Sequence, residues 1–262
     1  MYAVIEHGGK QYRVTEGQTL NIELTAVAPD ATAMELDKVL FIGNSHTYLN
    51  FMPQMLLALV NAGDRGHELM VDQCTGEGAS LEWHWENPSS RAKIAEKPWD
   101  FVVLQDRSGG PLEEPESFER HAGLLDSEIR KQAARTIFYL TWANRTRPDT
   151  QRVLAEAYAR IARKLGAILS PVGLAWEAVH REEPDVELHH RDGRHANPVG
   201  SYLAACVFYS VLFSTSAEGL TGTFYHNGKM RLDLDKDQAL LLQSVAWETV
   251  SSISDFGFGI SH

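Results

Sequence analysis

From Val39 onward, short apolar runs alternate with segments whose apolar residues recur every third or fourth position. The short runs are typical of buried strands, and the wider spacing is typical of helices with one buried face. Strands are expected at 39–43, 68–74, 99–105, 136–142 and 167–171, and helices at 48–62, 82–95 (short ones), 116–134, 148–165, 197–213 and 235–253. This alternation predicts an α/β fold, a three-layer doubly wound parallel sheet of about five strands.

The beginning of the chain has a different pattern. Residues 2–5, 11–14 and 20–24 favour three short strands separated by glycine-containing turns, the last with alternating apolar and polar residues. Such a pattern is that of a small β meander and not of an α/β sheet. We therefore divide the chain into an N-terminal β segment, 1–34, and an α/β domain, 35–262.

Composition narrows the class of protein. The chain has 262 residues, 44% of them hydrophobic, which is enough for one α/β domain with a full core. Its formal net charge of −11 argues against nucleic acid or an anionic membrane as a main partner. The two cysteines, Cys74 and Cys206, lie in segments expected to be buried, so we expect core residues rather than a disulfide.

The sequence lacks the usual motifs for membrane insertion, export, cofactor binding and metal binding. No apolar run is long enough to span a bilayer, and residues 1–7 do not have the pattern of a signal peptide, so a cytoplasmic location is expected. The sequence contains no phosphate-binding Gly-Lys-Ser/Thr loop, no dinucleotide fingerprint after a strand and no His-Glu-x-x-His pair. We therefore expect neither a cofactor nor a metal ion.

The first predicted strand of the α/β domain leads directly into a candidate nucleophile. Residues 39–43 end in Gly43, and Asn44, Ser45 and His46 follow before the next helix. This arrangement would place Ser45 at the carboxyl edge of the sheet, beside a helix N-terminus. A serine nucleophile needs a base, and the candidate is His195, three residues after Asp192. The alternatives are that Ser45 is only a helix N-cap and that 192–197 is only a polar loop.

These two blocks resemble the SGNH (GDSL-like) hydrolases. Residues 43–46 stand where that superfamily has its Gly-Asp-Ser block, and residues 192–203 reproduce its Asp-x-x-His block, in the same order. The resemblance runs from about residue 35 to the end and implies a flavodoxin-like arrangement of strands. It implies Ser45 as nucleophile, His195 as general base and Asp192 as the residue that orients it. His189 and His190 are competing bases that fit the pattern less well.

The same resemblance suggests donors for the oxyanion of an ester transition state. The backbone N–H of Ser45 is one, and the glycine-rich segment 75–81 would supply another, with Gly78 preferred and Gly76 second. Better-known members use an Asn after the third strand, where this chain has Gln105, whose side-chain amide offers the same donor. Asn44 is the remaining candidate.

A second resemblance covers the N-terminal segment. Residues 1–14, with 16–20 and the stretch up to about 43, are similar to the opening of bacterial ribosomal protein L-twenty-one of the large subunit. Only the first part of that family's length is represented. The pattern indicates a fusion of a ribosomal β segment to a hydrolase. We expect the β segment to serve structure or the assembly of a homo-oligomer.

The sequence therefore predicts a serine esterase with a Ser-His-Asp triad acting on small-molecule or sugar esters, with short acyl chains favoured. A carbohydrate O-acetyl esterase is the alternative, since aromatic residues near predicted loops could line a sugar pocket: Trp83, Trp85, Trp142 and Trp176. A ribosome- or RNA-associated protein and a pseudoenzyme are alternatives of a different class.

Overall fold

The computed structural model describes residues 3–7, 10–14, 36–63 and 68–254. The chain divides into two compact units, residues 1–35 and 36–262. In the first unit, β1 (Ala3–His7) and β2 (Lys10–Val14) form an antiparallel hairpin in which Ala3 lies opposite Val14. The third strand expected at 20–24 lies outside the described residues.

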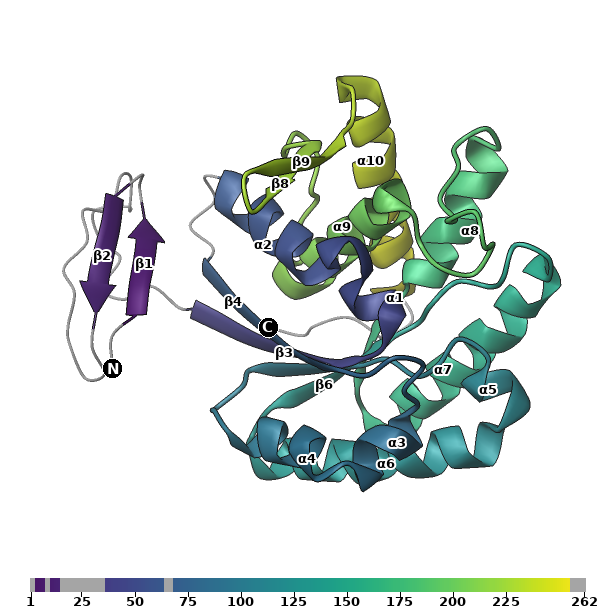
Figure 1. The fold of residues 1–262 in the computed structure, drawn as a ribbon. Helices are drawn as coiled ribbons and strands as arrows, with labels where there is room; N and C mark the ends of the chain where they lie inside the picture. Colours follow the sequence, from purple (N-terminus) through teal and green to yellow (C-terminus); the bar gives the residue numbers. More distant parts are fainter. Residues whose placement is uncertain (1–2, 8–9, 15–35, 64–67, 255–262) are drawn as a thin grey trace. The chain divides into compact units, whose positions relative to one another are not determined.

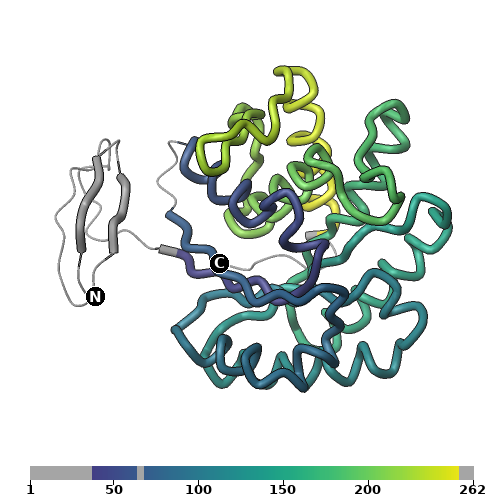
Figure 2. The backbone as a smooth tube through the Cα atoms, viewed as in Figure 1, coloured from purple at the N-terminus to yellow at the C-terminus, as the bar shows by residue number. Residues whose placement is uncertain are grey.

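The second unit is built on a five-stranded parallel sheet. Its strands are β3 (Leu36–Gly43), β4 (Glu68–Thr75), β5 (Phe101–Leu104), β6 (Arg135–Tyr139) and β7 (Ile168–Ser170), in the order β4-β3-β5-β6-β7. The backbone trace in Figure 2 shows the chain crossing between strands through helices. The predicted fold class and strand order are confirmed. The chain leaves β3 toward β4 and returns to its other side as β5, so the carboxyl end of β3 is where ligands are expected.

Helices cover both faces of this sheet (Figure 1). One layer contains α2 (Met52–Ala62), α8 (Val172–Glu182), α9 (Pro198–Phe213) and α10 (Lys236–Ser254). The other contains α3 (Leu81–Glu86), α4 (Pro88–Ala95), α6 (Pro115–Lys131) and α7 (Gln151–Leu165). Successive residues of β3 point to opposite faces, so Val39 and Phe41 join the first core and Leu40 and Ile42 the second.

The helix expected at 48–62 is interrupted. The chain forms a short helix α1 (Ser45–Tyr48) and a 3-10 turn η1 (Leu49–Phe51) before α2 begins at Met52. Asn50 and Phe51 have positive φ angles of 54° and 61°. The side chain of Asn50 donates to the Ala196 carbonyl at 3.0 Å and to Ser201 at 2.9 Å, which holds this break against the loop before α9. Tertiary hydrogen bonds therefore override the helical pattern here.

Several described elements were not predicted. They are α5 (Gly110–Glu113), α8 and the hairpin of β8 (Thr223–His226) and β9 (Lys229–Asp233). The helix expected at 148–165 begins with a 3-10 turn, η2 (Pro148–Thr150), before α7. The turn of the β8–β9 hairpin is Asn227-Gly228, with φ angles of 51° and 70°. Asn-Gly between alternating residues is a strong hairpin signal, so this element was readable from the sequence.

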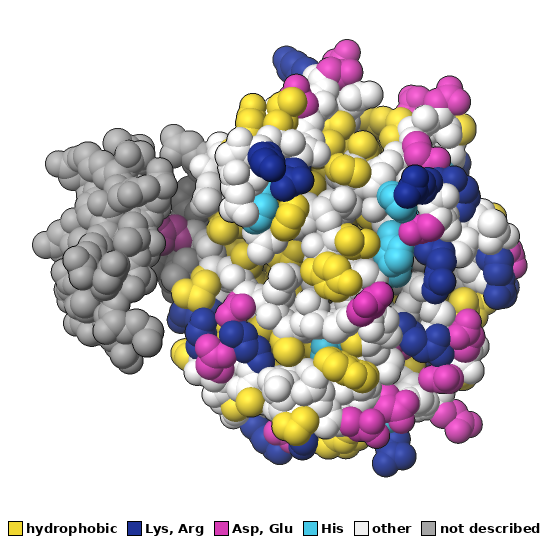
Figure 3. Space-filling model, in the orientation of Figure 1, with side chains coloured by type: hydrophobic (Ala, Val, Ile, Leu, Met, Phe, Trp, Pro, Cys, Tyr) yellow, Lys and Arg dark blue, Asp and Glu magenta, His cyan; other side chains and the backbone are white. Residues whose placement is uncertain are grey.

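The remaining features of this unit are the charge on its surface and the character of its helices. Acidic and basic side chains are interspersed over the face of this unit that Figure 3 shows. Among the helices that the structure describes, none combines the length and the apolar character needed to cross a membrane.

Candidate active site

The carboxyl end of β3 forms a tightly packed turn around Ser45. Asn44 is the N-cap of α1, and its side-chain oxygen accepts a hydrogen bond from the backbone N–H of His46 at 3.0 Å. Gly43 precedes it without room for a side chain, because an added Cβ would lie 2.5 Å from the Gln105 side-chain oxygen. The turn thus delivers Ser45 to the first position of a helix at the edge of the sheet.

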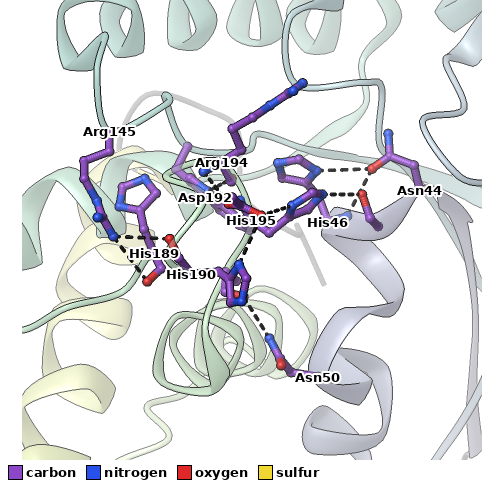
Figure 4. A network of polar contacts seen from close by, with 12 residues as sticks. Asn44, His46, Asn50, Arg145, His189, His190, Asp192, Arg194 and His195 are labelled. Carbon is purple, nitrogen blue, oxygen red and sulfur yellow. Dashed lines mark hydrogen bonds and ion pairs between the residues drawn. The ribbon is translucent and has the colours of Figure 1, made fainter.

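Ser45, His195 and Asp192 are joined by hydrogen bonds. The Ser45 Oγ lies 2.9 Å from Nε2 of His195, and Nδ1 of the same ring lies 2.8 Å from Oδ2 of Asp192. Figure 4 shows Asp192 and His195 meeting the Asn44–His46 turn from a separate loop. The sequence-predicted serine, histidine and aspartate are therefore brought together, with Nε2 placed to accept the serine proton and Nδ1–H to donate to the carboxylate.

The Asp192 carboxylate is held in its ionised form. Its other oxygen accepts the backbone N–H groups of Arg194 at 2.8 Å and His195 at 3.0 Å. Partial burial raises the pKa of Asp192, but the hydrogen bonds from the His195 ring and from these backbone groups outweigh it and hold the pKa well below its usual range. A permanent negative charge beside Nδ1 fixes the tautomer in which Nε2 accepts a proton.

The two competing histidines occupy different positions. His190 lies on the outer side of Asp192, with its Nδ1 3.1 Å from the same Oδ2. His189 is buried, and its Nε2 lies 3.1 Å from the Ala143 carbonyl. In the described residues, the hydrogen bond to Ser45 comes from His195, so the geometry favours His195 as the base.

A further histidine lies beside the base and was not singled out from the sequence. His46 is 7% exposed, and its ring lies 5.3 Å from that of His195 and 5.0 Å from that of Trp142. Burial, with the nearby His195 as second cause, lowers the pKa of His46 to about 3, so its imidazole is neutral at neutral pH. It forms a neutral wall behind His195 and adds no second charge.

Two backbone N–H groups are available where an oxyanion would form. Ser45 is the first residue of α1, where backbone N–H groups have no partner within the helix. Gly78 lines the adjacent pocket with a φ of 62°, and its N–H has no partner among the described residues. Gly76 is not equivalent, since its N–H donates to the Gly43 carbonyl at 3.1 Å. The structure therefore favours Gly78 over Gly76.

The expected role of Gln105 does not fit the structure. Its side chain is fully buried and lies outside the residues that line the pocket. Its oxygen accepts the Asn44 backbone N–H at 2.8 Å and the Thr47 hydroxyl at 3.0 Å, and its nitrogen donates to the Asp106 carbonyl. The amide N–H groups are directed into the protein, so Gln105 supports the nucleophile turn instead of donating to an oxyanion.

The side chain of Asn44, the alternative oxyanion donor, is also occupied by hydrogen bonds within the protein. Its side-chain nitrogen donates to the Ala79 carbonyl at 2.9 Å while its oxygen accepts from His46. This bond connects the nucleophile turn to the loop that carries Gly78. Asn44 therefore positions two parts of the site relative to each other.

A polar pocket of about 680 Å³ opens in front of Ser45 and His195. Its wall includes Tyr48, Leu49, Glu77, Gly78, Arg107, Ser108, Leu112, Glu113, Asn144, Arg147, Thr150, Leu154 and Arg194. None of the four tryptophans considered as a sugar platform belongs to it. Trp142 and Trp176 are buried and stack on each other at 3.9 Å, which is core packing. For these two residues the structure favours core packing over a place in a sugar-binding pocket.

The arrangement of possible metal ligands bears on whether the chain could hold a metal ion. Among the residues that the structure describes, no group of three or more His, Cys, Asp or Glu side chains is arranged to hold a metal ion.

A parallel doubly wound sheet with a hydrogen-bonded serine, histidine and aspartate at its carboxyl edge has the architecture of an α/β hydrolase. An SGNH hydrolase structure from Slackia heliotrinireducens is 30% identical, with a TM-score of 0.58, and the match covers 68% of this chain and 100% of that one. The chain belongs to the SGNH hydrolases.

Two more distant structures share the fold. A DUF4886 family protein from Bacteroides uniformis is 20% identical with a TM-score of 0.68, over 87% of this chain and 98% of that one. The acetyl xylan esterase AlAXEase is 17% identical with a TM-score of 0.55, over 67% of this chain and 100% of that one.

The N-terminal part matches a different family. The family described as Ribosomal prokaryotic L21 protein matches residues 1–62. Large ribosomal subunit protein bL21 of Dehalococcoides mccartyi is 42% identical over 67 residues, 26% of this chain and 50% of that protein. The bL21 of Alteromonas mediterranea is 57% identical over 44 residues, 17% of this chain and 42% of that protein. The chain spans half or less of the length of these relatives, and joins a bL21-like beginning to a hydrolase.

Proposed function

We propose that this chain is a serine esterase that hydrolyses carboxylic esters through an acyl-enzyme. The observation that carries the proposal is the continuous contact from Ser45 Oγ to His195 Nε2, at 2.9 Å, and from His195 Nδ1 to Asp192 Oδ2, at 2.8 Å. Hydrogen-bonded serine, histidine and carboxylate side chains in this order activate a nucleophile in unrelated folds.

In this mechanism, Ser45 Oγ attacks the ester carbonyl carbon while His195 Nε2 takes the serine proton. The carbonyl oxygen becomes negatively charged and is stabilised by the backbone N–H groups of Ser45 and Gly78. When the intermediate collapses, the carbon–oxygen bond to the alcohol breaks and His195 returns the proton to the departing alcohol. Water then attacks the acyl-enzyme by the same route and releases the acid and free Ser45.

The pocket favours small, polar esters. Its aliphatic lining consists of Leu49, Leu112, Ala143 and Leu154, placed among charged and polar side chains. Long acyl chains require a continuous apolar surface to gain binding free energy, at about 25 cal/mol per Å². We therefore expect short acyl chains to be preferred over long ones.

Removal of an acetyl group from a carbohydrate is the second candidate. The observation that favours it is the polar wall around Ser108 and Asn144, which could hydrogen-bond a hydroxylated alcohol. The acetyl xylan esterase AlAXEase shares the fold.

The test compares purified protein and its variants on p-nitrophenyl acetate, butyrate, octanoate and decanoate, and on acetylated xylooligosaccharides. Ser45→Ala should lower turnover by about six decades. Ser89→Ala, which removes an exposed hydroxyl outside the pocket wall, is the matched control and should retain activity.

A fluorophosphonate probe provides an independent readout of the nucleophile. Covalent labelling at Ser45, lost in Ser45→Ala, would support the proposal. A Ser45→Ala variant that keeps a substantial share of turnover would refute it. Absence of both labelling and hydrolysis in the unmodified protein would favour the pseudoenzyme alternative.

A further inference from the structure

The pocket carries two arginines that the chemistry of ester cleavage does not use. Arg147 and Arg194 both belong to its wall, and neither forms an ion pair with a described residue. The third arginine of the wall, Arg107, is paired with Glu113 at 2.7 Å and Glu114 at 3.1 Å. Two guanidinium groups are thus available to a ligand in a chain whose net charge is −11.

Both arginines come from backbone that is fixed relative to the nucleophile. Arg194 immediately precedes His195; its N–H donates to Asp192 at 2.8 Å and its carbonyl accepts from Trp142 at 2.9 Å. Its side chain extends away from the Asp192–His195 pair (Figure 4). The backbone of Arg147 donates to the Asn144 carbonyl at 2.9 Å, and its own carbonyl accepts from Thr150 Oγ1 at 2.7 Å.

The two loops are also joined to each other. The backbone N–H of Arg145 donates to the Gly193 carbonyl at 2.9 Å, which connects the turn carrying Arg147 to the loop carrying Arg194. The two arginines of the pocket wall therefore come from two loops that are hydrogen-bonded to each other. The carboxylates of the wall lie on other segments: Glu77 beside Gly78, and Glu113 on α5 in its pair with Arg107.

We infer that Arg147 and Arg194 bind a carboxylate carried by the substrate, so that the enzyme prefers esters with a negatively charged acyl or alcohol part. The inference rests on the proposed ester hydrolysis. Guanidinium groups match carboxylates in a bidentate geometry and stay charged at all physiological pH values. The acidic remainder of the surface gives no general attraction for anions, so the preference must arise at these two side chains.

The experiment compares matched charged and neutral esters. On the alcohol side the pair is 4-acetoxybenzoate and 4-acetoxybenzamide; on the acyl side it is the p-nitrophenyl monoester of glutarate and its terminal amide. The ratio of kcat/KM for the charged over the neutral ester is the readout, because this ratio does not depend on the fraction of folded protein. We expect a ratio of about ten in one of the two pairs, since an exposed ion pair contributes up to about fivefold.

In the double variant Arg147→Gln/Arg194→Gln, the ratio should fall to about two or less, and 0.5 M salt should lower it in the unmodified protein. Arg191→Gln is the matched control: it removes an exposed arginine from the same loop as Arg194, outside the pocket wall. It should leave the ratio unchanged. The pair in which the ratio is high tells whether the carboxylate belongs to the acid or to the alcohol.

Calorimetric binding of 4-acetamidobenzoate and 4-acetamidobenzamide separates this inference from the proposed function, because neither compound is an ester. Tighter binding of the carboxylate, lost in the double variant, supports the arginine site even if no ester is cleaved. Ratios near one in both ester pairs, or a ratio that survives the double substitution, would overturn the inference while leaving ester hydrolysis intact. Equal binding of these two amides, which carry the carboxylate on the alcohol side, would overturn the inference when the ratio for the acyl-side pair is also near one.

Discussion

The side-chain oxygen of Gln105 accepts the backbone N–H of Asn44 at 2.8 Å, so the residue that follows β5 holds the turn that presents the nucleophile. The same oxygen also accepts the Thr47 hydroxyl at 3.0 Å. One buried amide thus connects two adjacent strands to the first turn of α1. The position of Ser45 depends on this contact, although Gln105 lies outside the pocket wall.

Replacement of Gln105 by Ala should therefore reduce stability as well as turnover. It leaves the Asn44 N–H buried without an acceptor, which costs about 1–3 kcal/mol of unfolding free energy. Urea denaturation and kcat measured together check this expectation. Gln132→Ala, at the half-buried C-cap of α6 and outside the pocket wall, is the control and should change neither. A large fall in kcat with unchanged stability would instead restore Gln105 as a direct oxyanion donor.

Asp192 contacts two imidazoles, and only one of them reaches Ser45. Asp192→Asn should lower kcat by about four decades, because an amide can donate to Nδ1 and stabilise the wrong tautomer. His195→Ala should be comparably damaging, whereas His190→Ala should change kcat by no more than about threefold. Steady-state kinetics on p-nitrophenyl acetate measures all three. The assignment of the base would move to His190 if its replacement, and not that of His195, abolished activity.

Acid should destabilise the fold through a buried histidine. His84 is fully buried; its Nε2 lies 2.9 Å from the Gly43 carbonyl and its Nδ1 2.8 Å from Ser90 Oγ. Burial lowers its pKa to about 4 from 6.5. Between these values the unfolded chain binds a proton that the folded chain does not, so stability present above pH 6.5 is lost as the pH falls toward 4. The loss is about 3 kcal/mol at 1.36 kcal/mol per pKa unit.

Other groups titrate in the same range, so the test is a difference between variants. Burial raises the pKa of Asp106 to about 6, which acts in the opposite direction, and lowers that of His46 to about 3. His84→Gln keeps an amide donor for the Gly43 carbonyl and cannot be protonated. Urea denaturation at pH 7 and pH 4.5 should show a smaller acid loss in this variant, while the exposed His190→Gln should match the unmodified protein. Parallel losses in all three proteins would contradict the prediction.

The sequence predicted the parts of the site that depend on local pattern. The apolar run ending in Gly43 and the spacing of Asp192 and His195 are local features, and the expected fold class was confirmed by the parallel sheet. The direction of the Gln105 amide could not be predicted, because it depends on Asn44 and Thr47 from another strand-helix unit. The break at Asn50 likewise depends on contacts with the loop before α9.

The bL21-like beginning sets a limit on how the chain can be shortened. The match to that family covers residues 1–62, yet β3 lies inside the hydrolase sheet, between β4 and β5, and α2 packs in its core. We expect that deletion of residues 1–33 leaves the hydrolase unit folded and its ester activity retained. Deletion of residues 1–62 should abolish folding, because it removes β3, the strand with which both β4 and β5 pair. The same deletion also removes Ser45.

We expect residues 1–34 to serve structure or assembly and not RNA binding. A two-stranded hairpin is marginally stable alone, and its strand edges favour pairing with another surface or another copy. Deletion of 1–33 should therefore lower the melting temperature or dissolve an oligomer, as measured by thermal denaturation and analytical ultracentrifugation. Acidic residues outnumber basic ones in this segment, which disfavours phosphate contacts. Tight, salt-sensitive binding of ribosomal RNA by the full chain, lost on deletion, would show that the segment kept a ribosomal role.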